Sequence, residues 1–117
     1  MSVAVGRLAE DLATAHLETA GYQVLNRNWR NRWCELDIVA RKAGTVHFVE
    51  VKYRRHTNYG FAADYITRDK INRLRRAALA WCQAHGYDGA YQIDVIAVEG
   101  SLETPTITLT SNAINDF

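Results

Sequence analysis

The chain has 117 residues, is 48% hydrophobic, contains a single proline and carries a net charge of +1, which predicts one compact domain over residues 1–117 and excludes a low-complexity chain. Cys34 and Cys82 have neither CxxC spacing nor a nearby histidine pattern, which argues against a zinc site or a disulfide framework. The N-terminus lacks the pattern of a signal peptide, and no segment is long and apolar enough to span a membrane. We therefore expect a cytoplasmic protein without a membrane partner.

Positive charge is concentrated in the middle of the chain. Residues 27–76 hold thirteen lysines and arginines and five acids, a net charge of +8. The remaining residues hold one cation, Arg7, and eight acids, a net charge of −7. A basic segment between acidic ends favours a one-sided positive surface that attracts phosphates, although scattered, solvated arginines would give the same count.

Helical periodicity and strand alternation predict seven elements. In chain order they are a helix over residues 2–20 capped by Ser2, strands over 22–30, 34–42 and 45–54, a helix over 67–85, and strands over 91–99 and 106–110. A polar loop is expected over residues 56–63. The order α-β-β-β-α-β-β predicts an α/β fold, a mixed sheet with helices packed on it. On the first helix, Glu10 falls at the border of the apolar face, where the helix meets what it packs on.

The third predicted strand, "HFVEVKYRR", places Glu50 and Lys52 on one face among apolar residues. A two-residue turn at Ala43-Gly44 would place residue 42 opposite residue 45. The same register places Asp37 opposite Glu50 and Glu35 opposite Lys52. Opposed side chains lie about 5 Å apart, so Asp37 and Glu50 form a like-charge pair that destabilises the hairpin.

Two explanations reconcile the pair with a stable hairpin. One carboxylate stays protonated, or a divalent cation lies between Asp37 and Glu50, where oxygen ligands suit Mg²⁺ or Mn²⁺. Lys52 could then hold a phosphate or activate a water. The competing interpretation is a ladder of surface ion pairs on a solvated sheet face. Apolar residues on the same face count against it.

Basic residues around these strands and on one side of the second helix are candidates for sequence-independent phosphate contacts. They are Arg27, Arg30, Arg32, Arg54, Arg55, Lys70, Arg73 and Arg76. Trp29 and Trp33, interleaved with arginines, could stack on an exposed base, whereas tryptophans beside a strand are more often core or dimer contacts. For Asp94, in the last main strand, a place near the carboxylates and a structural hydrogen-bonding role both stay open.

Glu10 on the first helix, Asp37 on the second strand and Glu50-Val51-Lys52 on the third resemble the PD-(D/E)xK nuclease signature. The set is similar to that of archaeal Holliday junction resolvases. More narrowly, "GRLAEDLATAHLETAGYQVLNRNWR", "ELDIVA", "FVEVKYR" and "DKINRLRRAA" resemble the YraN-type family of small bacterial proteins, over about residues 6–98.

The resemblance implies a restriction-endonuclease-like core and Mg²⁺-dependent cleavage of DNA phosphodiesters, with branched DNA as one candidate substrate. Asp37, Glu50 and the Val51 carbonyl would hold the ion, and Glu10 would add a ligand directly or through water. Lys52 would orient the nucleophile. Glu35 would support this set, pairing with Lys52, and a homodimer is implied as well. Two alternatives stay open: a nucleic-acid-binding module that keeps the fold without catalysis, and a protein-interaction domain.

Overall fold

The computed structural model describes residues 3–55 and 67–113. The elements are, in chain order, α1 (Val3–Thr19), β1 (Gln23–Arg30), β2 (Glu35–Lys42), β3 (Thr45–Arg54), α2 (Arg68–Ala84), β4 (Tyr91–Glu99) and β5 (Thr106–Thr110). The predicted order is confirmed, and the predicted boundaries differ from the observed ones by at most one residue. Ser2, predicted as a cap, and the predicted loop over 56–63 lie outside the described residues.

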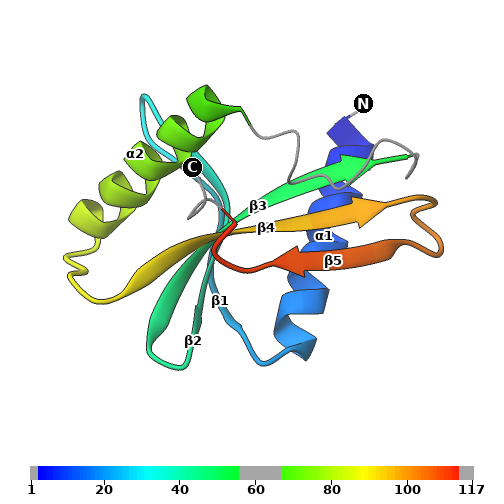
Figure 1. Ribbon diagram of the computed structural model, residues 1–117, viewed down its shortest axis with the longest axis horizontal. Coiled ribbons are helices and arrows are strands. Elements are labelled where there is room, and N and C mark those ends of the chain that lie inside the picture. The colour runs from blue at the N-terminus through cyan, green and yellow to red at the C-terminus, as the bar shows by residue number, and fades with distance from the viewer. Residues whose placement is uncertain (1–2, 56–66, 114–117) are drawn as a thin grey trace.

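The strands form one mixed sheet in the order β1-β2-β3-β4-β5, confirming the predicted α/β architecture. Neighbouring strands are antiparallel except β3 and β4, which are parallel and are separated in the chain by α2. The two helices lie on opposite faces of this sheet (Figure 1). Adjacent strand residues point to opposite faces, so Phe48 packs in the core beneath α2 and Val49 in the core beneath α1. Glu50 and Lys52 therefore belong to the α2 side.

The second helix begins where Thr67 accepts a hydrogen bond from the Lys70 backbone N–H, as an N-cap does. Its buried stripe, which includes Ile71 and Leu74, packs on the sheet and leaves a basic face uncovered. The helix ends at His85, followed by Gly86 with a positive φ of 59°. Within the described residues, neither helix is long and apolar enough to cross a membrane.

The turn between β2 and β3 has the predicted two residues. Ala43 and Gly44 have φ values of 51° and 78°, the left-handed pair that a tight hairpin requires. The ladder runs from the pair of residues 42 and 45 to the pair Ile38–Val49, which confirms the predicted register over that length. Beyond this pair β2 stays bonded to β1 and β3 to β4, but no ladder joins β2 to β3. Asp37 and Glu50 are the first residues past the end of the ladder.

Candidate metal and nucleic-acid site

Asp37 of β2 and Glu50 of β3 lie where the ladder between their strands ends. The backbone N–H of Val51 donates to Asp37 Oδ2 over 2.9 Å. Because the N–H and C=O of one strand residue point to the same side, the Val51 carbonyl also faces Asp37. Glu50 is buried and Asp37 is half-buried. The three predicted ligands therefore lie at neighbouring positions where β2 and β3 separate.

The fold only partly compensates the charge of this pair. Burial raises the pKa of both carboxyl groups above their ordinary values. For Glu50 the charge of Asp37 raises the pKa further, and for Asp37 the bond from Val51 lowers it. Lys70 and Lys52 lower both, but the net direction is upward. The two nearby lysines therefore do not fully offset the negative charge of Asp37 and Glu50, and a bound cation would stabilise the ionised pair.

Lys70 of α2 contacts Glu50 from the face of the sheet that α2 covers. Its Nζ lies 3.2 Å from Glu50 Oε1. Sequence analysis assigned Lys70 to phosphates because a helix face alone does not show which strand residue lies beneath it. Lys52, two positions after Glu50 on the same face, has no ion-pair partner within residues 3–55 and 67–113. Its ammonium is the more available of the two for a substrate.

Glu10 of α1 interacts with Asp37 through its charge. Its pKa is raised by burial first and by the charge of Asp37 second. Glu10 Oε1 is buried and has no hydrogen-bond partner. An ion pair between Arg27 and Asp11, 2.7 Å between Nη2 and Oδ1, ties this part of α1 to β1. Arg27, predicted to contact phosphate, has this local role in the structure.

Asn28 is a neighbour of the site that sequence analysis missed. It lies in β1 between the pairs Arg27–Ile38 and Trp29–Leu36, so it stands opposite Asp37. Its φ of 50° is left-handed, a conformation that asparagine tolerates better than most residues. A hydrogen bond from its side chain lowers the pKa of Glu10. The sequence offers no signal for this role beyond the residue type itself.

These groups fit a hard divalent cation that keeps several waters. Mg²⁺ is commonly held by one or two carboxylates, with water in the remaining positions. Asp37, Glu50 and the Val51 carbonyl supply such a set. Among the residues that the structure describes, no three His, Cys, Asp or Glu side chains are close enough to hold one ion. Glu10 fits better as a ligand through water, and its unpartnered Oε1 is a suitable acceptor.

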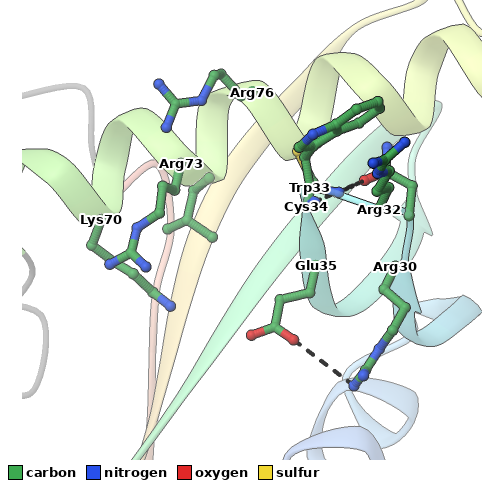
Figure 2. Close-up of a pocket in the computed structure, with 10 residues that line it drawn as sticks. Arg30, Arg32, Trp33, Cys34, Glu35, Lys70, Arg73 and Arg76 are labelled. Carbon is green, nitrogen blue, oxygen red and sulfur yellow. Dashed lines mark hydrogen bonds and ion pairs between the residues drawn. The ribbon is translucent and has the colours of Figure 1, made fainter.

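A basic pocket of about 340 Å³ lies between the β1–β2 turn and α2. Its lining consists of Arg30, Asn31, Arg32, Trp33, Cys34, Glu35, Lys70, Arg73, Leu74 and Arg76. Five of the eight basic residues predicted to contact phosphate are among them. Figure 2 shows Lys70 and Arg73 projecting from α2 toward the end of β2 that carries Glu35. Lys70, one of the lining residues, also pairs with Glu50, so this side chain joins the pocket wall to the carboxylate pair.

Other predicted site residues lie outside this arrangement. Arg54 and Arg55 follow at the end of β3 and do not line the pocket. The expected pairing of Glu35 with Lys52 is not found among the described residues, because the hairpin ladder ends before it reaches them. Glu35 instead lies 3.8 Å from Arg30 Nη2 at an exposed position of the pocket wall. Trp29 is a half-buried contact of the core beneath α2.

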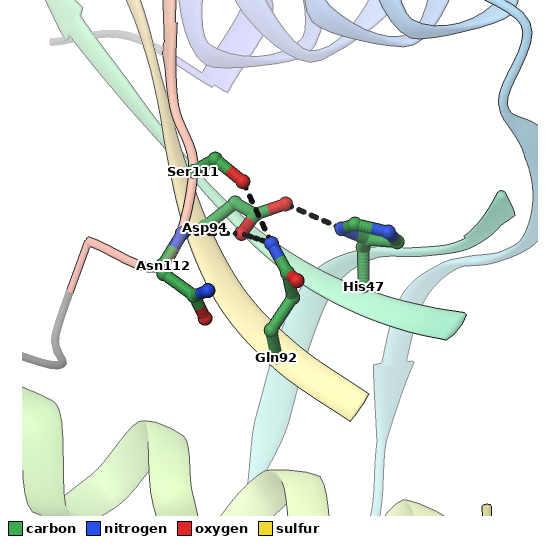
Figure 3. Close-up of polar contacts among 5 residues, drawn as sticks. All are labelled: His47, Gln92, Asp94, Ser111 and Asn112. Carbon is green, nitrogen blue, oxygen red and sulfur yellow. Dashed lines mark hydrogen bonds and ion pairs between the residues drawn. The ribbon is translucent and has the colours of Figure 1, made fainter. Parts of the chain in front are cut away.

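Asp94 has the structural role that was one of its two alternatives. It is fully buried and accepts hydrogen bonds from Gln92 Nε2 and the Asn112 backbone N–H, and its Oδ2 lies 2.7 Å from His47 Nδ1 (Figure 3). Its ladder partner is Val49, whose side chain packs beneath α1. Asp94 therefore faces the opposite side of the sheet from Glu50. The network links β3, β4 and the end of β5.

Comparison with known proteins identifies the family. The model of the uncharacterised protein family UPF0102 matches residues 9–98. The chain belongs to the UPF0102 family. A UPF0102 protein of Mycobacterium sp. (strain KMS) is 46% identical over 109 residues, covering 90% of this chain and 81% of the relative. UPF0102 proteins of Leifsonia xyli and Clavibacter michiganensis are 44% and 45% identical over 95 residues, covering 80% of both chains in each case.

The UPF0102 match confirms the YraN-type resemblance at the level of the family. The matched region includes the candidate site residues from Glu10 to Lys52 and the basic face of α2. The names of these relatives state no activity. The chemistry of the UPF0102 site must therefore be argued from its residues.

Removing the charge of Asp37 in this UPF0102 chain is expected to increase its stability at neutral pH. In Asp37→Asn the amide oxygen can still accept the Val51 N–H, while the charge beside Glu50 disappears. The free energy of unfolding is expected to rise by about 0.5–2 kcal/mol, the usual range for a single stabilising substitution, because the repulsion between the two carboxylates is removed. Thermal unfolding measured across pH checks this.

The pH dependence follows from the raised pKa of Asp37. Between the unfolded pKa, about 4, and the higher folded pKa, the folded state binds more protons, so wild type loses stability as the pH rises. The gain of Asp37→Asn should be complete above the folded pKa and vanish below about pH 4. Asp88→Asn, at an exposed position, is the matched control. A variant less stable than wild type at neutral pH would show that the carboxylate stabilises the fold.

Proposed function

We propose that this protein is a cytoplasmic nucleic-acid-binding protein with a restriction-endonuclease-like core, which hydrolyses DNA phosphodiesters with Mg²⁺ or Mn²⁺. The observation that carries the proposal is the placement of Asp37 and Glu50 at the end of the β2–β3 ladder, beside a basic pocket. A carboxylate pair alone has structural explanations. A pair of largely buried carboxyl groups with raised pKa values, next to a basic pocket that could bind phosphates, is typical of a catalytic site.

The residues divide into ligands and substrate contacts. Asp37, Glu50 and the Val51 carbonyl would hold the cation, and Glu10 would bind one of its waters. When bound, such a cation supplies Lewis-acid stabilisation of the negative charge that develops on the phosphate. Lys52, free of ion pairs among the described residues, would orient the attacking water or neutralise the same charge.

The basic residues of the pocket position the substrate. Arg30, Arg32, Arg73 and Arg76 can bind the DNA backbone through phosphates, which gives affinity without sequence preference. Lys70 lies between the pocket and Glu50. A phosphate next to Lys70 would therefore lie near the carboxylates. Branched DNA and a homodimeric assembly belong to the same proposal.

A second candidate is a nucleic-acid-binding module without catalysis. It is favoured by the ion pair between Lys70 and Glu50, since a lysine can substitute for a cation beside a carboxylate. In that case the pair would hold α2 on the sheet, and the basic pocket would carry the function by itself.

Cleavage assays separate the two candidates. Plasmid and four-way-junction DNA are incubated with Mg²⁺, Mn²⁺ or EDTA, using wild type, Lys52→Ala and Asp37→Ala. The proposal expects cleavage by wild type with either metal and little by the variants. If both variants cut as well as wild type, the activity belongs to another site or a contaminant. Salt-sensitive binding without metal-dependent cleavage would establish the second candidate.

Replacing Arg73 by alanine is expected to weaken binding to all DNA sequences and to reduce the salt dependence. Loss of one phosphate contact lowers the slope of log K against log salt concentration by about one. Fluorescence anisotropy over a salt series measures both quantities. Arg75→Ala is the control on the same helix, since Arg75 is exposed and does not line the pocket. Equal slopes for the two variants would remove the pocket from the proposed interface.

A further inference from the structure

Trp33 is the most exposed large hydrophobic residue among those that the structure describes, followed closely by Val3. Trp33 is 80% exposed and Val3 79%, whereas Trp81 is 4% exposed. Trp33 lies in the turn between β1 and β2, on the wall of the basic pocket. An indole in solvent offers a large flat apolar face, and beside a basic pocket this face is available to a ligand that carries both a ring and a negative charge.

The backbone of the turn holds Trp33 in place. Asn31 Oδ1 accepts hydrogen bonds from the backbone N–H groups of Trp33, over 2.9 Å, and of Cys34, over 2.7 Å. The Asn31 N–H donates to the Cys34 carbonyl over 2.9 Å and closes the turn. A fixed turn reduces the conformational entropy that a ligand would otherwise have to overcome.

Cationic groups share the pocket with the ring. The Arg32 guanidinium lies 5.4 Å from the centre of the Trp33 ring. Arg73 and Arg76 of α2 line the same pocket, and Figure 2 shows these side chains together with Trp33. An aromatic face next to several arginines matches a nucleotide, whose base stacks on the ring while its phosphate binds the cations. A purely apolar protein partner would not require this density of positive charge.

We infer that Trp33 stacks on an unpaired base, so that the pocket selects DNA with unpaired nucleotides next to a duplex over fully paired DNA. This inference rests on the proposed nucleic-acid binding and names the substrate class. Paired bases inside a duplex have both faces covered by neighbours, whereas an unpaired base can lie on an indole. Lys70, shared by the pocket and the Glu50 ion pair, links this base to the carboxylate site.

Binding in EDTA tests the inference independently of cleavage. Fluorescence anisotropy compares a blunt hairpin duplex with the same duplex carrying a short unpaired flap, for wild type, Trp33→Ala, Trp33→Leu and Trp33→Phe. Wild type should prefer the flapped duplex by about tenfold, the range expected for one stacked base. Trp33→Ala and Trp33→Leu should lose the preference and keep their affinity for the blunt duplex. Trp33→Phe should retain most of the preference.

Leu79→Ala provides the matched control, because Leu79 is an exposed apolar residue of α2 outside the pocket. It should bind both probes as wild type does. Equal binding of both probes by wild type, or an unchanged preference in Trp33→Ala, overturns the inference and leaves the proposed DNA binding standing. No binding to either probe overturns both. Sedimentation showing that Trp33→Ala dissociates a dimer would assign the ring to a contact between copies.

Discussion

Asp37→Asn is expected to reduce metal-dependent DNA cleavage more than about 100-fold, because even groups that only support a metal ligand cost 10–100-fold when removed. Asp37 is the residue through which the site is organised: it receives the Val51 N–H over 2.9 Å and raises the pKa of Glu50 and of Glu10 by its charge. The substitution keeps the size and the hydrogen-bond acceptor of the side chain. It removes the charge that a divalent cation requires.

The same variant is expected to be more stable than wild type at neutral pH, so an unfolded protein would not explain the loss. Its affinity for DNA in EDTA should also stay within about threefold, because phosphate contacts come from the basic pocket. Cleavage rates are measured under single-turnover conditions, with Asp88→Asn as the control at an exposed aspartate. Asp37→Asn cutting at a rate close to that of wild type would exclude Asp37 as a ligand.

Trp81→Ala is expected to lower the free energy of unfolding by about 3–5 kcal/mol, the usual cost of deleting a buried aromatic side chain. Trp81 of α2 is 4% exposed, and its Nε1 donates to Asn26 Oδ1 over 2.9 Å. Its ring stacks on His85 at 4.1 Å and packs edge to face with Phe48 at 5.6 Å. The contacts with Asn26 of β1 and Phe48 of β3 hold α2, and with it the basic face, on the sheet.

Trp33→Ala is the control for this effect, since the exposed ring should change stability by no more than about 0.5 kcal/mol. Urea unfolding, followed by circular dichroism, gives both values. A cost below about 1 kcal/mol for Trp81→Ala would mean that α2 is held mainly by other contacts. The ion pair between Lys70 and Glu50 would then be the first alternative to examine.

Sequence patterns predicted the fold well because each element has a strong local signal. The alternation in β3 and the apolar stripe of α2 define their buried faces, and the Ala43-Gly44 turn sets the hairpin register. That register placed Asp37 and Glu50 on the same face at neighbouring positions. Periodicity could not show that the ladder ends just before them, because the separation of β2 from β3 depends on how each pairs with its outer neighbour.

Contacts between segments that are distant in the sequence could not be predicted from local sequence patterns. Lys70 and Arg73 lie on the same side of α2 and both line the basic pocket. Only the packing of α2 on the sheet shows that Lys70 also contacts Glu50. Asn28 reaches Glu10 because of a left-handed backbone conformation inside a strand, which no periodicity predicts. Trp29 and Trp33 look alike in sequence, and their difference in burial follows from the three-dimensional path of the turn.

We propose above that Asp37 and Glu50 hold a divalent metal ion. Anomalous diffraction from a crystal soaked in Mn²⁺ tests it most directly, because the signal locates the ion independently of activity. We predict a peak between the two carboxylates, next to the Val51 carbonyl, with Lys70 displaced from Glu50. The absence of a peak there, with the ion pair between Lys70 and Glu50 intact, would contradict the claim.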